Sequence, residues 1–281
     1  SCTREEILTA AGSRYSPASP CEDLGLIEKA TTPCVFIGKP CDVLGANNAA
    51  KLRPGLNEKL GLTIAFFCAG TPSTDGTLQM LKRMGVNDPA AVKSLRYRGL
   101  GWPGKANVEY VDGPATRKAD LTYAEAWGDL LQKHRQWRCY ICPDHTGEFA
   151  DIAVGDPWYR EIRLGEEGTS LVLARTQKGK DTILKAIASG YIVAEKVKSN
   201  ILPASQPNLI KTRGALWGRL AALKLMNAPS PHYSNIALFT IWLSELSLKE
   251  KMQSILGTIK RVFVKGLKKR HKHSAMYQEN A

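Results

Sequence analysis

Two short, continuous apolar runs stand near the start of the chain, at residues 33–38 and 62–68. Each is followed by Gly and Pro and then by a segment with helical spacing, 41–52 after the first run and 74–84 after the second. Continuous apolar runs of this length are typical of strands that are buried on both faces, as in parallel sheets. A strand followed by a helix, twice in succession, predicts a parallel α/β core.

The rest of the chain shows further strand and helix patterns. Helices are predicted at residues 3–11, 123–134 and 181–188, and strands at 170–176 and on both sides of a Gly- and Pro-rich turn within 94–111. From about residue 205 amphipathic helices follow, and Pro229 and Pro231 separate two of them. The pattern predicts an α/β domain over residues 1–200, with a mixed, largely parallel sheet and flanking helices, and a helical extension over residues 201–281.

Composition agrees with a globular chain that does not cross a membrane. The 281 residues are 43% hydrophobic, enough for one large domain or two of ordinary size. The longest apolar run, residues 236–243, is far shorter than the roughly 20 residues that a membrane-spanning helix needs. Because the chain begins with Ser1 and shows no signal pattern, we expect that upstream sequence is missing.

Positive charge is concentrated near the C-terminal end. The formal charge is +13, and residues 249–272 hold nine Lys or Arg against one Glu. Five apolar residues of this segment fall on one face of a predicted helix, with basic residues on the others: Ile255, Ile259, Val262, Phe263 and Leu267. Such a helix suits an acidic membrane surface or an acidic protein, and packing on the core is the equally weighted alternative.

Seven cysteines are too few for a disulfide scaffold and odd in number, so we expect a reducing, cytoplasmic compartment. Cys139 and Cys142 form a C-x-x-C, a spacing that lets two thiolates point at one metal centre. Cys41 and Cys68 each follow a predicted strand, and the carboxyl ends of neighbouring parallel strands lie side by side. All four thiols could therefore converge.

The kind of metal centre stays open at this point. Four thiolates fit a structural zinc ion or a [4Fe-4S] cluster, and spacing does not separate the two. Alternatively, Cys41 and Cys68 are small buried apolar residues, as free cysteines often are. Cys2, Cys21 and Cys34 are expected not to be ligands, because none has a second cysteine at metal spacing.

Other motifs favour structural roles. Residues 99–104 match the G-x-G-x-x-G dinucleotide pattern, but a strand rather than a helix follows, so no nicotinamide site is expected. Asp156 is expected to cap the segment after it rather than to bond near a cofactor. His134 and His145 flank the cysteine pair and are expected at the surface, with proton relay or cluster tuning as the alternative.

Five segments in one order resemble the β subunits of the coenzyme F420 hydrogenases and dehydrogenases. They are residues 10–15, 38–41, 67–68, 139–142 and 150–156, within a match that runs from residue 4 to about 195. Five weak matches with compatible spacing are hard to obtain by chance, so the chain is identified as a member of this iron–sulfur flavoprotein family. The segment that family members carry ahead of the first motif is expected to be absent from this sequence.

The resemblance implies an oxidoreductase with FAD and a [4Fe-4S] cluster, held by cysteines that match Cys41, Cys68, Cys139 and Cys142. Electrons would pass between that cluster, served by ferredoxin or a partner subunit, and FAD, and then to a deazaflavin or another organic hydride acceptor. Residues 1–200 would then form the flavin and iron–sulfur domain, including an iron–sulfur loop region, and 201–281 a basic helical extension.

Five residues are expected to contact the flavin cofactor. Gly12 permits close backbone approach, Ser13 and Arg14 offer donors to the pyrophosphate, and Tyr15 offers a ring face. Lys39, at a strand end, could meet a phosphate or stabilise the reduced ring. From the residues alone, a helix C-cap and a solvated loop lysine are about equally good interpretations, and no catalytic residue is assigned.

Two rival functions remain. A nucleic-acid-binding module with a structural zinc ion is supported by the charge of +13 and by the C-x-x-C pair. Against it, the charge lies in one tail and no recognition motif is present, so we expect no nucleic-acid partner. The other rival is a non-catalytic electron-transfer subunit whose substrate site lies on a partner.

Overall fold

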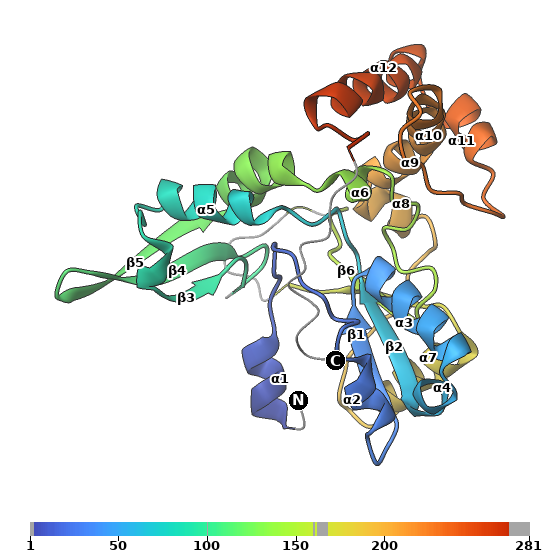
Figure 1. Ribbon diagram of the computed structural model, residues 1–281. Coiled ribbons are helices and arrows are strands. Elements are labelled where there is room, and N and C mark those ends of the chain that lie inside the picture. The colour runs from blue at the N-terminus through green and yellow to red at the C-terminus, as the bar shows by residue number, and fades with distance from the viewer. Residues whose placement is uncertain (1–2, 100, 160, 162–167, 270–281) are drawn as a thin grey trace. The chain divides into compact units, whose positions relative to one another are not determined.

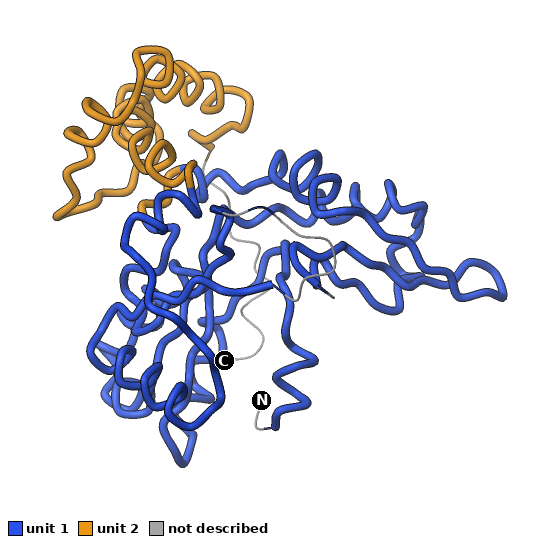
Figure 2. Tube along the Cα trace, turned by 180° about the vertical axis from the view of Figure 1, so that it is seen from behind, with its two compact units in different colours: residues 1–140, 144–206 blue, residues 141–143, 207–281 orange. Residues whose placement is uncertain are grey.

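The computed structural model describes residues 3–99, 101–159, 161 and 168–269, which form two compact units (Figure 2). Unit 1 contains residues 1–140 and 144–206, and unit 2 contains residues 141–143 and 207–281. The functional roles predicted for residues 1–200 and 201–281 stay predictions.

Unit 1 contains two sheets and most of the short helices (Figure 1). Its elements in chain order are α1 (Arg4–Ala10), α2 (Leu24–Glu28), β1 (Cys34–Gly38), α3 (Pro40–Leu52), α4 (Pro54–Lys59), β2 (Leu60–Phe66), α5 (Thr74–Arg83), η1 (Pro89–Ala91), β3 (Val92–Arg96), β4 (Lys105–Asp112), β5 (Ala115–Thr122), η2 (Ala124–Leu130), η3 (Leu131–His134), α6 (Trp137–Tyr140), β6 (Ile152–Gly155), β7 (Leu171–Ala174), α7 (Gln177–Ala188) and α8 (Ile201–Ser205). The predicted α/β fold is confirmed.

The first sheet has the strand order β1-β2-β6-β7 and is largely parallel. β1 pairs with β2 in parallel, and β2 pairs with β6 in parallel, whereas β7 joins β6 antiparallel. The two strands predicted at the start of the chain are therefore confirmed. β6 was not predicted, because it is only four residues long and lies inside a segment rich in Asp and Gly.

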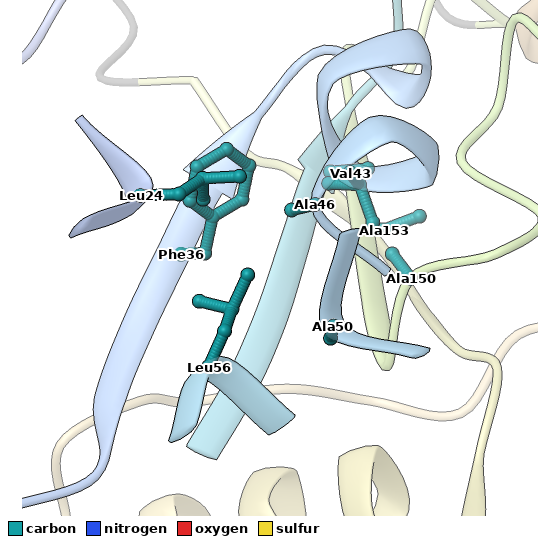
Figure 3. Close-up of a cluster of buried hydrophobic side chains, with 9 residues drawn as sticks. Leu24, Phe36, Val43, Ala46, Ala50, Leu56, Ala150 and Ala153 are labelled. Atoms are coloured by element: carbon teal, nitrogen blue, oxygen red, sulfur yellow. The ribbon is translucent and has the colours of Figure 1, made fainter. Parts of the chain in front are cut away.

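One face of this sheet carries the first hydrophobic core. Figure 3 shows Phe36 of β1 gathered with Val43 and Ala46 of α3 and with Leu56 of α4, all of them buried. The other face is open at β1, where Val35 is 55% exposed and Ile37 60%. The expectation of burial on both faces is wrong for this strand, because α3 packs on the side of Phe36.

The second sheet is the antiparallel meander β3-β4-β5. Ala106 and Val108 of β4 alternate toward a second core, where they join Met80 and Leu81 of α5. The two strands predicted around the Gly- and Pro-rich turn are confirmed, but β5 was missed because its side chains are mostly polar and exposed. The predicted helix at 123–134 forms as the π-helical turn η2 followed by the tighter η3.

Unit 2 is a helical bundle of α9 (Asn208–Gly214), α10 (Leu216–Leu225), α11 (Leu238–Glu245) and α12 (Leu248–Val264). An added Cβ at Gly218 of α10 would lie 2.0 Å from Ser254 Oγ of α12, so the glycine permits close helix packing. Trp242 Nε1 of α11 donates to the same hydroxyl at 3.1 Å. In the part of the chain that the structure describes, no helix is both long and apolar enough to span a bilayer.

The predicted apolar face of α12 is only partly correct. Ser254, Thr258 and Val262 face the bundle and are buried. Phe263, which was assigned to the same face as Val262, is 69% exposed. Leu267 lies beyond the end of the helix.

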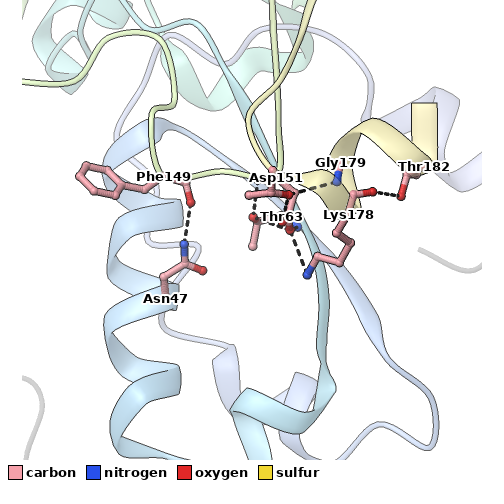
Figure 4. A network of polar contacts seen from close by, with 8 residues as sticks. Asn47, Thr63, Phe149, Asp151, Lys178, Gly179 and Thr182 are labelled. Carbon is pink, nitrogen blue, oxygen red and sulfur yellow. Dashed lines mark hydrogen bonds and ion pairs between the residues drawn. The ribbon is translucent and has the colours of Figure 1, made fainter. Parts of the chain in front are cut away.

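Asp151 joins three elements of unit 1 through its carboxylate (Figure 4). The carboxylate accepts hydrogen bonds from the backbone N–H of Thr63 on β2, at 2.9 Å, and from the Thr176 hydroxyl at the start of α7, at 2.7 Å. Lys178 Nζ lies 3.2 Å away. Burial alone would raise the pKa of Asp151, but the hydrogen bonds from Thr176 and Thr63 outweigh it, and the pKa lies below its ordinary value.

Asp151→Ala should lower the free energy of unfolding by about 2–3 kcal/mol at neutral pH, because it leaves the buried Thr63 N–H without its acceptor. The depressed pKa means that this stability is complete above the ordinary aspartate pKa of about 3.9 and is lost as the pH falls below it. Urea titrations at neutral and acid pH measure both effects. Asp23→Ala is the control, because Asp23 is exposed and makes no capping hydrogen bond, and a loss as large as that of Asp151→Ala would contradict the account.

Candidate functional site

The carboxyl ends of β1, β2 and β6 lie at one edge of the first sheet, because the three strands are parallel neighbours. Cys41 comes three residues after the end of β1, and Cys68 two residues after the end of β2. Asp156 follows β6 directly. Cys41, Cys68 and Asp156 are far apart in sequence, but all three lie near the carboxyl ends of these strands.

Cys139 of α6 contacts the segment that follows Cys68. Its sulfur accepts the backbone N–H of Thr71 at 3.3 Å. Gly70 has a φ of +123°, and a Cβ added there would lie 3.1 Å from the Cβ of Cys139. Only glycine suits both the backbone conformation and the close approach, so this position brings the loop after β2 against α6.

Cys41 is electrostatically coupled to Cys139. Desolvation of the sulfur and the Asp42 carboxylate raise the pKa of the Cys41 thiol, the cations of Lys39 and Arg138 lower it, and the charge of Cys139 raises it further. Burial and the neighbouring negative charges therefore disfavour the thiolate form of Cys41. A bound metal reverses this effect, because its positive charge deprotonates the thiols that coordinate it.

His145 fixes the backbone of Cys68. The Cys68 N–H donates to the His145 carbonyl at 3.0 Å, and His145 Nδ1 lies 2.8 Å from the Cys68 carbonyl oxygen. The expectation of a surface position is wrong for His145, which is 8% exposed, whereas His134 is half-buried and bonds Gln79. His145 thus holds the residue that was predicted as a ligand.

Cys142 belongs to unit 2, where the Tyr233 hydroxyl donates to the carbonyl of Ile141 at 2.7 Å. Burial and then the charge of Cys142 raise the pKa of Tyr233 to about 12.

Three cysteines were expected not to be ligands. The Cys21 thiol donates to a backbone carbonyl of α3, and the Cys34 thiol donates to the carbonyl of Thr32. Cys2 lies outside the described residues.

The structure does not show a formed ligand sphere. Within residues 3–99, 101–159, 161 and 168–269, no three side chains of His, Cys, Asp or Glu lie where they could hold one metal ion. What it does show is that Cys41, Cys68 and Cys139 belong to one edge of the sheet and its adjoining loops. The thiol donors fit iron or zinc chemically, and their role as ligands stays a prediction.

A cavity of about 910 Å³ lies between residues 9–14 and the polar face of the β3-β4-β5 sheet. This volume is at the upper end of the range of roughly 300–1,000 Å³ that cofactor sites occupy. Three of the residues predicted to contact flavin line it, namely Gly12, Ser13 and Arg14, together with polar and charged side chains of the sheet that include Arg96, Asn107, Glu109, Lys118 and Asp120.

Position 12, in the wall of this cavity, requires a glycine. Its φ is +119°, and an added Cβ would lie 2.9 Å from Arg96 Nη1 and 3.2 Å from the Arg98 carbonyl. The same Arg96 nitrogen donates to the Ala11 carbonyl at 2.7 Å. A hydrogen bond from β3 therefore holds the segment that carries Ser13 and Arg14 over the sheet.

Tyr15 and Lys39, the other two predicted flavin contacts, do not line this cavity. The Tyr15 ring packs in the second core, with its centroid 4.7 Å from that of Trp127. Lys39 forms an ion pair with Asp42 at 2.6 Å at the start of α3, and both side chains are 12% exposed. Their contacts with a cofactor stay predictions.

A charged cluster that the sequence did not reveal surrounds Asp156. Arg98 donates two hydrogen bonds to the Asp156 carboxylate, at 2.7 and 3.1 Å, and Trp102 Nε1 donates a third at 3.0 Å. The Asp156 carboxylate thus binds side chains of the Gly- and Pro-rich turn, and a capping role for it stays a prediction. The Arg98 guanidinium also lies over the rings of Tyr123 and Trp158, which stack on each other.

Comparison with known proteins agrees with the family resemblance that the sequence motifs show. A family model for the C-terminal part of the coenzyme F420 hydrogenase/dehydrogenase beta subunit matches residues 32–200. An uncharacterized protein of Methanocaldococcus jannaschii is 26% identical over 205 residues, which are 69% of this chain and 51% of that protein. The coenzyme F420 hydrogenase subunit beta of Methanosarcina barkeri is 26% identical over 207 residues, 70% of this chain and 63% of that subunit.

A solved structure supports the fold. A chain of the F420-reducing [NiFe] hydrogenase complex from Methanosarcina barkeri superimposes with a TM-score of 0.51 at 22% identity, covering 79% of this chain and 74% of that one. The chain spans about half to two thirds of the length of the two curated relatives named above.

Asp156→Ala should lower the free energy of unfolding by about 2–3 kcal/mol, because it leaves the largely buried Arg98 cation without its partner. The Arg98 side chain is 13% exposed. Chemical denaturation measures the loss. Asp112→Ala is the matched control, since it breaks the exposed pair with Arg117 and should cost less than about 1 kcal/mol. Equal losses from the two variants would show that the Arg98 cluster is not specially stabilising.

Proposed function

Because the chain belongs to the coenzyme F420 hydrogenase/dehydrogenase β-subunit family, we propose that it is an oxidoreductase subunit that moves electrons between a [4Fe-4S] cluster and FAD. The observation that carries the proposal is the common edge of β1, β2 and β6, to which Cys41 and Cys68 are delivered beside Cys139. Carboxyl edges of open α/β sheets are the usual location of ligand sites.

The cluster would be held by Cys41, Cys68, Cys139 and Cys142. Thiolates are the ligands that iron–sulfur clusters use, and the C-x-x-C pair supplies two of them. Bound together, the cluster and the flavin would connect hydride transfer to single-electron transfer.

FAD would occupy the cavity on the β3-β4-β5 sheet. Arg14, Arg96 and Lys118 provide positive charge for a diphosphate, and the Gly12–Ser13 backbone can approach it closely. Glu109 and Asp120 face the same space and offer acceptors for hydroxyl groups. The residues that line the cavity therefore fit a polar, anionic dinucleotide.

The proposed electron partner is ferredoxin or another subunit, and the proposed acceptor is a deazaflavin or another organic hydride acceptor. A non-catalytic electron-transfer subunit is the second candidate, because the similar chain from Methanosarcina barkeri comes from a hydrogenase complex. Single-turnover reduction of bound flavin by candidate donors, with and without ferredoxin, separates a self-sufficient enzyme from an electron-transfer subunit.

The zinc-containing nucleic-acid module is no longer favoured, since the family match covers both strand-end cysteines and the C-x-x-C.

Replacing a proposed ligand should remove the cluster. Cys68→Ser and Cys139→Ser are expected to lose most of the visible iron–sulfur absorbance after anaerobic reconstitution, because serine is a poor ligand for these clusters. Iron and sulfide assays check this result. Cys34→Ser is the matched control, as its thiol donates to the Thr32 carbonyl and is not a proposed ligand, and it should retain full absorbance. Retention of the cluster in both ligand variants would exclude this ligand set.

Reversing charge in the cavity should weaken flavin binding. Arg14→Glu is expected to raise the Kd for FAD about tenfold or more, because a charge-assisted hydrogen bond to phosphate is replaced by repulsion. Titration of FAD fluorescence measures the affinity. Arg4→Glu serves as control, since Arg4 is exposed on α1 and does not line the cavity. If both variants bind FAD as the parent chain does, the cofactor lies elsewhere.

A further inference from the structure

Helix α12 of unit 2 carries an apolar stripe on its exposed side. The stripe consists of Leu248, Met252, Leu256 and Phe263, whose exposed fractions are 77%, 48%, 55% and 69%. Spacings of four, four and seven residues place these side chains on one face of an α-helix. The face toward the bundle is a different one, formed by Ser254, Thr258 and Val262. The stripe is therefore not part of the hydrophobic core of unit 2.

Positive charge lies along one flank of the stripe and beyond the C-terminal end of the helix. At about 100° per residue, Lys249 and Lys260 fall along one flank of it, and both are exposed. Lys265, Lys268 and Lys269 follow the helix. Across residues 207–269, all within unit 2, the sequence has eleven Lys or Arg against two Glu and no Asp. Any partner of this face must therefore accept both apolar and cationic side chains.

We propose that α12 docks on the surface of an anionic phospholipid bilayer, with the stripe at the boundary of headgroups and acyl chains and the lysines at the phosphates. An amphipathic helix with one apolar face and Lys-rich flanks binds in this way, lying in the plane of the interface. The stripe runs over about 22 Å, at 1.5 Å per residue from Leu248 to Phe263. The contact is peripheral, since the helix lies along the surface and does not cross the bilayer.

Charge and apolarity together favour lipid over other occupants. A second copy of unit 2 would bring the eleven basic residues of its segment 207–269 against the same number, which electrostatic repulsion opposes. An acidic protein would match the charge, but it would also have to supply an apolar surface for four large side chains. An anionic bilayer provides a layer of phosphates directly above an apolar interior, and thus meets both requirements.

The test is co-sedimentation of the full chain with vesicles of phosphatidylcholine alone and with vesicles of equal parts phosphatidylcholine and phosphatidylglycerol. Binding is expected only to the anionic vesicles and should weaken as salt is raised. Phe263→Gln should weaken binding about tenfold through lost apolar burial, and Lys249→Glu or Lys260→Glu at least about fivefold each. All three side chains are exposed, so circular dichroism should show an unchanged fold.

Matched controls lie in unit 1. Leu52→Gln removes a leucine that is 85% exposed on α3, and Lys82→Glu reverses an exposed charge on α5, and neither should alter vesicle binding. Equal binding to neutral and anionic vesicles, or equal losses from the control and stripe variants, would overturn the proposal. Absence of vesicle binding together with salt-sensitive binding of an acidic ferredoxin would also overturn it, in favour of a protein partner. None of these three outcomes depends on bound flavin or iron, so the redox proposal is tested separately.

Discussion

Parallel pairing of β1, β2 and β6 is the constraint on which the candidate cluster site depends. Parallel strands run in one direction, so each of the three chain segments leaves the sheet at the same edge. Cys41, Cys68 and Asp156 are separated by many residues in sequence and reach one side of unit 1 for this reason. The loops beyond the strands are then held by local contacts, of Cys68 with His145 and of Gly70 with Cys139.

The second sheet contributes a different kind of surface. Its strands alternate between an apolar face that packs on α5 and a polar face that lines the cavity. Gly12 allows the chain to cross over that polar face, and the hydrogen bond from Arg96 to Ala11 holds it there. Unit 1 thus separates a sulfur-rich sheet edge from a polar cavity of a size suited to a dinucleotide. A flavoprotein with a cluster needs both kinds of site.

Sequence patterns were sufficient for the elements with strong local signals. The apolar runs at β1 and β2 and the helical spacing of α3 and α5 predicted these elements. A buried strand or helix needs apolar residues at the positions that face the core, and this requirement leaves a pattern in the sequence. β5 and β6 were missed, since the first is polar and exposed and the second is too short to show a period. The pairing of Arg98 with Asp156 spans 58 residues, and only the three-dimensional fold could reveal it. The packing of Tyr15 against Trp127 is likewise a contact between distant residues that the sequence pattern did not show.

The proposed iron–sulfur cluster would be held by the thiols at the sheet edge and in the C-x-x-C. The most direct measurement is the content of iron, acid-labile sulfide and zinc per chain after anaerobic reconstitution, read together with the visible spectrum before and after dithionite. We expect about four iron and four sulfide per chain, little zinc, and a brown colour that dithionite bleaches. A colourless protein with one zinc ion and no sulfide would contradict it.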